Sequence, residues 1–319
     1  MRRINGDNMN FRKLDKLINV ITAMITPLGS DLSIDQEKYR EFIRFQIESG
    51  CQLLTMGTTG ECATLSHEEH QLAMEITVDE AQKSGADPFV LAGTGSNSTK
   101  EAISLSEYAE MIGVDGLLLV VPYYNKPAQH SLITHFSEIA DSVSLPIILY
   151  NVPSRTGRNL EPETVAYLAS TKENIVGIKC ASGNIDQITK IIKTTPDDFI
   201  VLSGDDSMTY HIMALGGKGV VSVTSNIFPT QLVRFTEAMT SGDWEFARQE
   251  QLRLYELFKI LFIEPNPGPV KYAADLMNIM NKRMRLPLSA PLNENQRKIA
   301  NVIERYIGVE KQELLQMNA

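Results

Sequence analysis

The chain has 319 residues, of which 43% are hydrophobic and 22% are charged, so it holds enough apolar material for one large domain or two ordinary ones. The formal net charge is −9 and no basic cluster stands out, which argues against a nucleic-acid-binding protein. No apolar run is long enough to cross a bilayer, so no membrane association is expected.

The first 16 residues are polar and carry several Lys and Arg side chains, but they lack the apolar core of a signal peptide. We therefore interpret residues 1–16 as a flexible N-terminal extension. The cysteines Cys51, Cys62 and Cys180 are widely spaced and form no Cys-x-x-Cys pair, so neither a disulfide framework nor a zinc site is predicted. A reducing cytoplasm fits this cysteine usage best.

Eight short apolar runs predict β-strands, because they are rich in β-branched residues and end at Gly, Pro or polar turn residues. In chain order these runs are 18–25, 52–56, 89–92, 116–121, 146–150, 175–181, 199–202 and 219–223. Helical patterns alternate with the strands. Asp35 precedes an apolar i, i+3, i+4, i+8 stripe that begins at Tyr39, and Ser66 with Glu69 forms a capping-box sequence.

The alternation predicts parallel strands that are joined by helices. Eight strand–helix units between residues 17 and 241 match a closed (β/α)₈ TIM barrel, an α/β fold. A doubly wound open sheet is the alternative. That fold would need a phosphate-binding glycine fingerprint, and the candidate Gly93-x-Gly95 lacks the third glycine.

After residue 241 the strand–helix alternation stops. Residues 244–262, 269–280 and 293–306 read as three helices, and Pro265 and Pro267 separate the first two. We expect residues 242–319 to form a C-terminal helical module packed on the barrel. Its expected role is structural, through added buried surface or contacts between subunits.

Lys179 stands at the C-terminal end of the sixth predicted strand. Lysine is rarely placed where it must leave water, and a dry environment favours its neutral, nucleophilic amine. A neutral amine is what a lysine needs to form a Schiff base with a carbonyl compound. The structural alternative is an edge-strand lysine whose ammonium reaches solvent.

Polar side chains follow several of the other predicted strands as well. They are Thr58 and Thr59 after the second strand, Tyr123 and Tyr124 after the fourth, Tyr150 and Arg155 after the fifth, and Ser203 and Gly204 after the seventh. In a barrel these strand ends meet at one face, where active sites lie. Their joint placement around Lys179 favours a lysine-centred active site over eight separate structural explanations.

These residues, taken with the motifs around them, resemble those of the dihydrodipicolinate synthase family of Schiff-base aldolases. The matching motifs are Gly-Thr-Thr-Gly-Glu at 57–61, Tyr-Asn-Val-Pro-Ser-Arg-Thr-Gly at 150–157, Gly-Ile-Lys at 177–179, Leu-Ser-Gly-Asp-Asp at 202–206, Gly-Val-Val-Ser-Val at 219–223 and Asn-Pro-x-Pro-Val-Lys at 266–271. The similarity runs from about residue 17 to near residue 307. It implies a (β/α)₈ barrel followed by a helical C-terminal domain.

The resemblance implies that pyruvate forms an imine with Lys179. The resulting enamine then attacks L-aspartate-4-semialdehyde, which gives 4-hydroxy-tetrahydrodipicolinate in the biosynthesis of diaminopimelate and lysine. No cofactor and no metal are implied. The implied assembly is a homo-oligomer, commonly a tetramer built from two tight dimers.

The resemblance also assigns roles to residues. Tyr150, Thr58 and Tyr124 would form a proton relay, with Tyr124 coming from a neighbouring subunit. Thr59 and the backbone of Thr58 would bind the pyruvate carboxylate, while Gly204 and Val221 would contact the substrate beside the lysine.

Arg155 would grip the carboxylate of the semialdehyde, because a guanidinium can donate two parallel hydrogen bonds. Related sugar-acid aldolases usually lack the Ser-Arg-Thr-Gly sequence that holds it. Val221 stands where relatives often carry isoleucine, and Cys180 where they often carry glutamate. We expect Cys180 to point away from the barrel interior.

A second group of residues matches the positions that bind feedback lysine in sensitive family members. These positions are Cys62, Ala63, His67, His70, Asn97, Glu101 and Tyr123. Glu101 and Asn97 offer acceptor oxygens for a cationic ligand. The structural alternative is that the two histidines are simply solvated on an exposed helix.

Three other functions stay open from the sequence. One is a sibling aldolase or lyase that acts on N-acetylneuraminate or other sugar-derived 2-oxo acids. Another is a non-catalytic paralogue that binds pyruvate or lysine as a sensor, against which the presence of Lys179, Tyr150 and Thr58 argues. A metal-dependent aldolase would need clustered histidine and carboxylate ligands, and none of the five histidines stands at these strand ends.

Overall fold

The structure, a computed structural model, describes residues 13–317, with the side chains described as far as residue 308. Residues 1–12 of the expected N-terminal extension lie outside this range. Leu14–Leu17 already form a 3₁₀ turn, and Leu17 is buried in the barrel interior. Lys13 and Lys16 form ion pairs with Asp87, so the chain packs against the barrel from its first described residues onward.

Eight parallel strands close into a barrel in sequence order, with β8 returning to pair with β1. They are β1 (Asn19–Ala23), β2 (Gln52–Thr55), β3 (Val90–Gly93), β4 (Gly116–Val120), β5 (Ile147–Asn151), β6 (Ile175–Cys180), β7 (Ile200–Ser203) and β8 (Gly219–Ser222). The observed strands agree with the predicted ones to within one or two residues at most ends. The predicted (β/α)₈ barrel is therefore confirmed.

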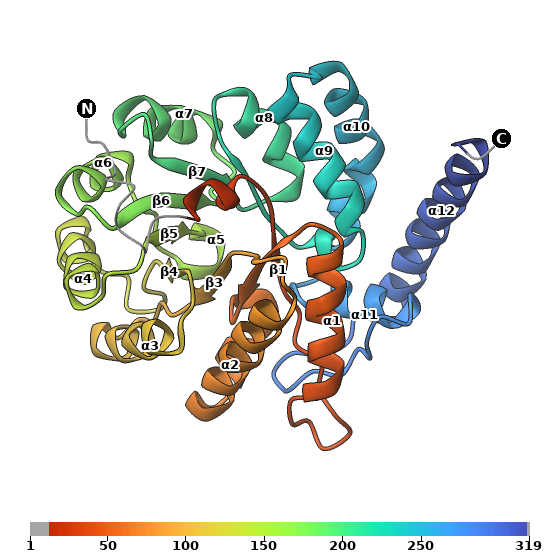
Figure 1. Ribbon diagram of the computed structural model, residues 1–319, viewed down its shortest axis with the longest axis horizontal. Coiled ribbons are helices and arrows are strands. Elements are labelled where there is room, and N and C mark those ends of the chain that lie inside the picture. The colour runs from red at the N-terminus through yellow and green to blue at the C-terminus, as the bar shows by residue number, and fades with distance from the viewer. Residues whose placement is uncertain (1–12, 318–319) are drawn as a thin grey trace.

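Helices surround the barrel and alternate with its strands, as Figure 1 shows. They are α1 (Gln36–Glu48), α2 (His67–Lys83), α3 (Thr99–Ile112), α4 (Gln129–Ser142), α6 (Pro162–Thr171), α7 (Ile185–Thr194), α8 (Thr209–Ala214) and α9 (Pro229–Ser241), with α5 (Pro153–Thr156) as a single turn. The capping box predicted at Ser66 and Glu69 begins α2, and Asp35 caps α1. None of the helices in the described part of the chain has the length and apolar character that crossing a membrane requires.

The hydrophobic core has two layers, as strands that alternate between two buried faces require. The inner layer fills the barrel and includes Leu54, Leu118 and Leu202. The outer layer lies between the strands and the helices, and it contains Ile178 and Cys180. Lys179 stands between these two outward-facing residues, so its side chain points into the barrel.

The glycines at 93 and 95 serve close packing between strands. A Cβ atom at Gly93 would lie 2.2 Å from the carbonyl oxygen of Met56, and one at Gly95 would lie 2.3 Å from the amide nitrogen of Val120. Only glycine fits such approaches of backbone to backbone. This explains the Gly-x-Gly pattern without a phosphate-binding loop.

Three helices follow the barrel, as predicted: α10 (Trp244–Ile260), α11 (Gly268–Leu276) and α12 (Asn293–Met317). The last one runs to Met317 rather than ending near residue 306, and it extends away from the body of the molecule in Figure 1. A buried ion pair joins this region to the barrel. Lys271 of α11 donates to Glu61 and to the carbonyl oxygen of Thr26, just after β1.

Candidate active site

Lys179 lies at the C-terminal end of β6 with its side chain inside the barrel mouth. In the strand register it is paired with Tyr150 of β5 on one side and Leu202 of β7 on the other. Only 6% of the lysine is exposed to solvent. The structure therefore excludes the alternative in which this lysine reaches bulk water from an edge strand.

The lysine faces a cavity of about 200 Å³. The residues that line it are Ala23, Leu54, Gly57, Thr58, Thr59, Leu118, Tyr150, Val152, Ser154, Arg155, Lys179, Ala181, Gly204, Asp205, Val223, Phe262 and Asn266. They come from the ends of several strands and from the segment between α10 and α11. A cavity of this size suits a small, polar metabolite, because polar groups from several strand ends converge on it.

Burial lowers the pKa of Lys179 to about 7, since the dry surroundings disfavour the ammonium form. The negative charge of Asp206 opposes this shift, whereas the positive charge of Arg155 reinforces it. The amine nitrogen lies 4.1 Å from the centre of the Tyr150 ring. A large neutral fraction at pH 7 gives this amine the nucleophilicity that carbonyl chemistry requires.

The lowered pKa predicts the pH dependence of Lys179 towards a small amine reagent such as cyanate. Carbamylation should rise with pH, reach half its plateau near pH 7 and change little above pH 8, because the neutral amine is then fully formed. An ordinary lysine, with a pKa of about 10.4, keeps gaining reactivity beyond pH 9. Peptide mass mapping at each pH measures both in one sample. A Lys179 rate that still climbs at pH 9 contradicts the prediction.

Tyr150 is buried beside the lysine, and both Tyr150 and Thr58 line the cavity. Burial raises the pKa of Tyr150 to about 12, although the Arg155 charge and the Thr58 hydrogen bond act in the opposite direction. The phenol is therefore protonated at neutral pH. A protonated phenol in the same cavity as a second hydroxyl can pass a proton to or from a group bound at Lys179.

Thr59 and Arg155 also reach the cavity, and both contact Asn266. The side-chain amide of Asn266 donates to the Thr59 hydroxyl at 2.9 Å, and Nη2 of Arg155 donates to the backbone carbonyl oxygen of Asn266 at 3.3 Å. Thr59 belongs to the short 3₁₀ turn Thr58–Gly60 that follows β2. The turn and the arginine place a hydroxyl and a guanidinium around the same opening.

Two residues expected at the site are not among those that line the cavity. Tyr124 is 90% exposed and has a backbone φ of 72°. Val221 lies in the inner layer of the barrel core, whereas Val223, two residues further on, lines the cavity. Gly204 does line it, and a Cβ atom there would come within 2.8 Å of the Ala181 side chain.

The residues expected to bind lysine lie around the ends of β2, β3 and β4. Glu101 accepts hydrogen bonds from Ser96 and His67, and the first of these lowers the pKa of its carboxyl, which therefore stays ionised at neutral pH. Asn97 donates to the Tyr123 carbonyl oxygen at 3.2 Å. These contacts place an anionic oxygen and several polar groups together at the surface.

The remaining members of the lysine-binding set are Cys62, Ala63 and His70, of which Ala63 is exposed, Cys62 is partly buried and His70 is buried. Burial raises the pKa of the Cys62 thiol to about 11, and Ala63 follows it in the 3₁₀ turn Cys62–Thr64. His70 is buried and its Nε2 lies 2.8 Å from the carbonyl oxygen of Gly93. His70 is therefore tied to the end of β3, so the alternative of a histidine simply solvated on the helix surface does not describe it.

The sequence assigned no role to Asp206, Phe262 or Asn266. Asp206 is buried, and one of its oxygens accepts from the backbone amides of Val223 and Thr224. Asp206 and Asn266 belong to the Leu-Ser-Gly-Asp-Asp and Asn-Pro-x-Pro sequences, so those patterns were the available signal. The expectation that the C-terminal module is only structural needs correction, because Phe262 and Asn266 line the cavity.

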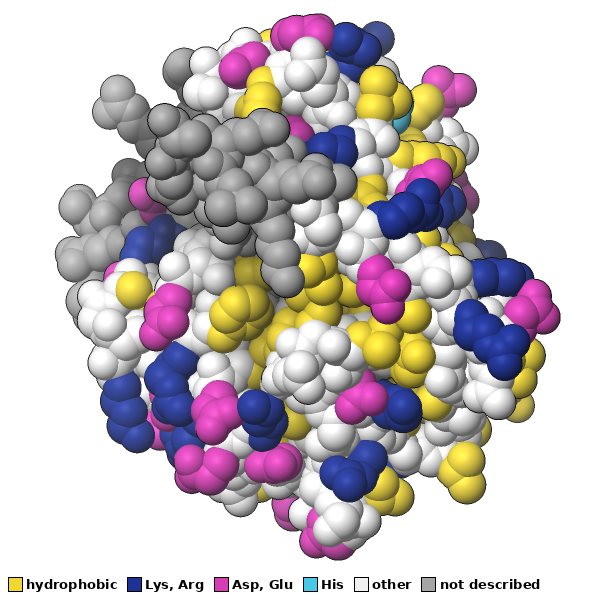
Figure 2. Space-filling view, turned by 90° about the vertical axis from the view of Figure 1, so that its right-hand side faces the viewer, with side chains coloured by type: hydrophobic (Ala, Val, Ile, Leu, Met, Phe, Trp, Pro, Cys, Tyr) yellow, Lys and Arg dark blue, Asp and Glu magenta, His cyan; other side chains and the backbone are white. Residues whose placement is uncertain are grey.

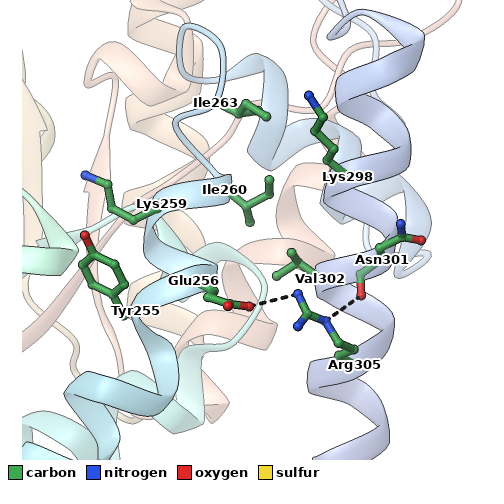
Figure 3. A pocket seen from close by; sticks show the side chains of 9 residues that line it. All are labelled: Tyr255, Glu256, Lys259, Ile260, Ile263, Lys298, Asn301, Val302 and Arg305. Carbon is green, nitrogen blue, oxygen red and sulfur yellow. Dashed lines mark hydrogen bonds and ion pairs between the residues drawn. The ribbon is translucent and has the colours of Figure 1, made fainter.

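A larger hollow of about 570 Å³ lies between α10 and α12, away from the strand ends (Figure 3). Its floor carries Ile260, Ile263 and Val302, and an ion pair joins Glu256 to Arg305 at one end. Figure 2 shows hydrophobic side chains gathered on this side of the molecule, with charged ones spread around them. The lysines that line the hollow, Lys259 and Lys298, are exposed, so the hollow lacks the buried amine found in the barrel cavity. Among the described residues, no three His, Cys, Asp or Glu side chains gather as metal ligands would.

Comparison with known proteins identifies relatives that match this chain over most of its length. Residues 16–306 match the Dihydrodipicolinate synthetase family. A 4-hydroxy-tetrahydrodipicolinate synthase from Methanopyrus kandleri is 52% identical over 271 residues, which cover 84% of this chain and 89% of the relative.

Two solved structures share the fold along almost their whole length. A dihydrodipicolinate synthase from Acinetobacter baumannii, complexed with pyruvate, has a TM-score of 0.87 at 38% identity and covers 90% of this chain and 98% of its own. The enzyme from Cyanidioschyzon merolae with lysine bound also has a TM-score of 0.87, at 37% identity, and covers 90% of this chain and 97% of its own.

Proposed function

The chain belongs to the dihydrodipicolinate synthetase family, and we propose that it is a lyase that condenses pyruvate with L-aspartate-4-semialdehyde to 4-hydroxy-tetrahydrodipicolinate. The observation that carries this proposal is the buried amine of Lys179, in a small cavity that Tyr150 and Thr58 also line. Such an enzyme serves the biosynthesis of diaminopimelate and lysine.

In the proposed reaction the neutral amine of Lys179 adds to the keto carbon of pyruvate, and the keto oxygen leaves as water. The positively charged imine nitrogen draws electrons from the neighbouring methyl group, which loses a proton and becomes an enamine carbon. That carbon attacks the aldehyde carbon of the semialdehyde, whose oxygen takes up a proton. The amino group of the product then displaces Lys179 from the imine carbon, which closes the ring and frees the enzyme.

Tyr150 and Thr58 would carry the protons of these steps, because the phenol is protonated at neutral pH and both side chains line the cavity of the lysine. We propose that Tyr124 of a second copy completes the relay. Its exposure of 90% and its absence from the lining of its own cavity support a role outside its own barrel. The assembly would then be a homo-oligomer, a dimer or a dimer of dimers, located in the cytoplasm.

Thr59 would bind the pyruvate carboxylate, with Gly204 and the barrel wall near Val221 shaping the space beside the lysine. Arg155 would bind the carboxylate of the semialdehyde from the cavity mouth. This division explains why one site carries two anion-binding groups.

The decisive experiment reduces the protein with borohydride in the presence of pyruvate and maps the modified peptide by mass spectrometry. A three-carbon adduct on Lys179 is expected. Turnover is then compared with pyruvate plus the semialdehyde and with pyruvate plus N-acetylmannosamine. Turnover only with the sugar supports the sibling aldolase instead, and an adduct without any turnover supports the sensor.

Replacing Arg155 by lysine should raise the KM for the semialdehyde by about 10- to 100-fold, because the positive charge remains but the paired hydrogen bonds are lost. Trapping of pyruvate at Lys179 should proceed as in the parent protein, since the imine forms before the semialdehyde binds. Steady-state kinetics with each substrate varied in turn separates the two effects. Arg158→Lys, in the same loop but outside the cavity lining, is the matched control.

We further propose that lysine inhibits the enzyme at the cluster around Glu101. The ionised carboxylate of Glu101 and the nearby amide of Asn97 support an ammonium-binding site, and a related enzyme has been crystallised with lysine bound. The other members of the cluster would shape the pocket around the ligand.

Millimolar lysine should lower the initial rate of the parent protein. Glu101→Gln should weaken the inhibition by at least about tenfold while kcat stays near the parent value, because the substitution removes the charge and keeps the shape. Glu107→Gln, on the exposed side of the same helix, is the control and should leave the inhibition curve unchanged. An initial rate that does not respond to millimolar lysine contradicts the proposal.

A further inference from the structure

The segment between α10 and α11 enters the mouth of the barrel, although it is more than 200 residues from the turn that it contacts. Two of its residues, Phe262 and Asn266, line the cavity of Lys179. Asn266 is only 4% exposed, so its polar groups need protein or substrate partners. Its contacts therefore bear directly on how the cavity is arranged.

Asn266 contacts both side chains to which the proposed function gives carboxylate-binding roles. Its side-chain Nδ2 donates to Oγ1 of Thr59 at 2.9 Å, and its backbone carbonyl oxygen accepts from Nη2 of Arg155 at 3.3 Å. One residue of the C-terminal module thus touches the threonine that would face pyruvate and the arginine that would face the semialdehyde.

The segment that carries Asn266 is itself anchored to the threonine turn. Lys271 donates to Glu61, the residue that follows the turn Thr58–Gly60, and to the carbonyl oxygen of Thr26. Thr26 in turn donates its hydroxyl to the carbonyl oxygen of Gly60 at 2.7 Å. Because two buried contacts hold the C-terminal end of the turn, the Asn266 amide meets the Thr59 hydroxyl in a fixed geometry.

A threonine hydroxyl has one proton to donate and can accept on its lone pairs. When the Asn266 amide donates to Thr59, the threonine oxygen acts as acceptor and its own proton is free to point into the cavity. Donation into that oxygen also polarises the O–H bond, which makes the hydroxyl a better donor to an anion. Thr59 is thereby prepared to bind a carboxylate.

We propose that Asn266 is a positioning residue that orients the Thr59 hydroxyl toward the carboxylate of the keto acid. This inference rests on the proposed function and adds to it a specificity role for the C-terminal module. An aspartate at position 266 has only acceptor oxygens when ionised, so it would take the Thr59 proton for itself and would repel an anionic substrate.

The test compares Asn266→Asp, Asn266→Ala and Thr59→Ala with the parent protein, with Thr59→Ala/Asn266→Asp as the double variant. Asn266→Asp should raise the KM for pyruvate by about tenfold or more, while kcat at saturating pyruvate changes by less than about threefold. Asn266→Ala should raise it less, because it removes the donor without adding a charge. Asn281→Asp makes the same change at an asparagine that contacts the Leu28 carbonyl oxygen, and it should match the parent.

The double variant distinguishes positioning from general loosening. If Asn266 acts through Thr59, adding Asn266→Asp to Thr59→Ala should raise the pyruvate KM by much less than it does in the parent background. Full additivity, or an Asn266→Asp variant with the parent KM, overturns the inference. If Asn266→Asp fails to fold, the same comparison is made with Asn266→Ala. A parent protein that does not trap pyruvate at Lys179 refutes the proposed function itself. If the parent turns over normally, a negative result with the variants counts only against the role of Asn266.

Discussion

Replacing Lys179 by methionine should remove essentially all activity, with a fall in kcat of roughly 10⁴-fold or more, because the nucleophile that forms the covalent intermediate is absent. Borohydride and pyruvate should then leave no adduct at this position. The measurement combines a sensitive product assay with mass mapping, and it is made on protein whose melting curve is recorded first.

The melting curve makes the loss of activity interpretable. The folded protein holds Lys179 in dry surroundings that lower its pKa to about 7, so below the unfolded pKa of about 10.4 folding must either release a proton or, under about pH 7, bury a charge. Methionine has a similar length and needs neither, so Tm should not fall. Lys282→Met, which removes a half-exposed lysine, is the control and should keep full activity. Substantial residual turnover in Lys179→Met would place the chemistry elsewhere.

The second large effect concerns stability. Lys271→Met should lower the free energy of unfolding by about 3–5 kcal/mol, because it leaves the buried carboxylate of Glu61 without its cation. Lys271 is 0% exposed, and burial lowers the pKa of its ammonium although Glu61 opposes that shift. The corresponding fall in Tm is on the order of 10 °C for a chain of this size.

Two comparisons make the stability result specific. Lys282→Met removes a surface ion pair that is worth at most about 1 kcal/mol, so it should shift Tm little. The double variant Glu61→Gln/Lys271→Met removes both charges and should recover much of the lost stability, because no unpaired charge stays buried. If Lys271→Met melts with the parent, the buried pair does not tie the C-terminal module to the barrel.

The role of the C-terminal module shows where prediction from local pattern stopped. The three helices after residue 241 were found from their periodicity and from the prolines between them, and the structure contains all three. Periodicity describes which face of a helix is buried, but not what the connecting segments touch. The contacts of Asn266 with Thr59 and of Lys271 with Glu61 each join residues more than 200 positions apart, so neither sequence neighbourhood signals them.

Tyr124 and Val221 show the same limit at the scale of one residue. Strand ends could be located to within one or two positions, which was enough to bring Thr58, Tyr150 and Lys179 to one face. Which side chains near a strand end reach the cavity depends on the local backbone, as the exposure of Tyr124 and the place of Val223, two residues beyond Val221, show.

By itself the sequence determined the alternation of strands and helices, the closed barrel, the family and the lysine at the end of the sixth strand, because apolar period and strand-end chemistry are local properties. Only the tertiary structure decided that this lysine is buried away from water and that the C-terminal module completes the cavity wall. It also decided that Asp206 raises the pKa of the lysine while Arg155 lowers it. Dryness and charge coupling depend on distances between segments remote in the chain, and those distances exist only once the barrel has closed and the last helices have packed against it.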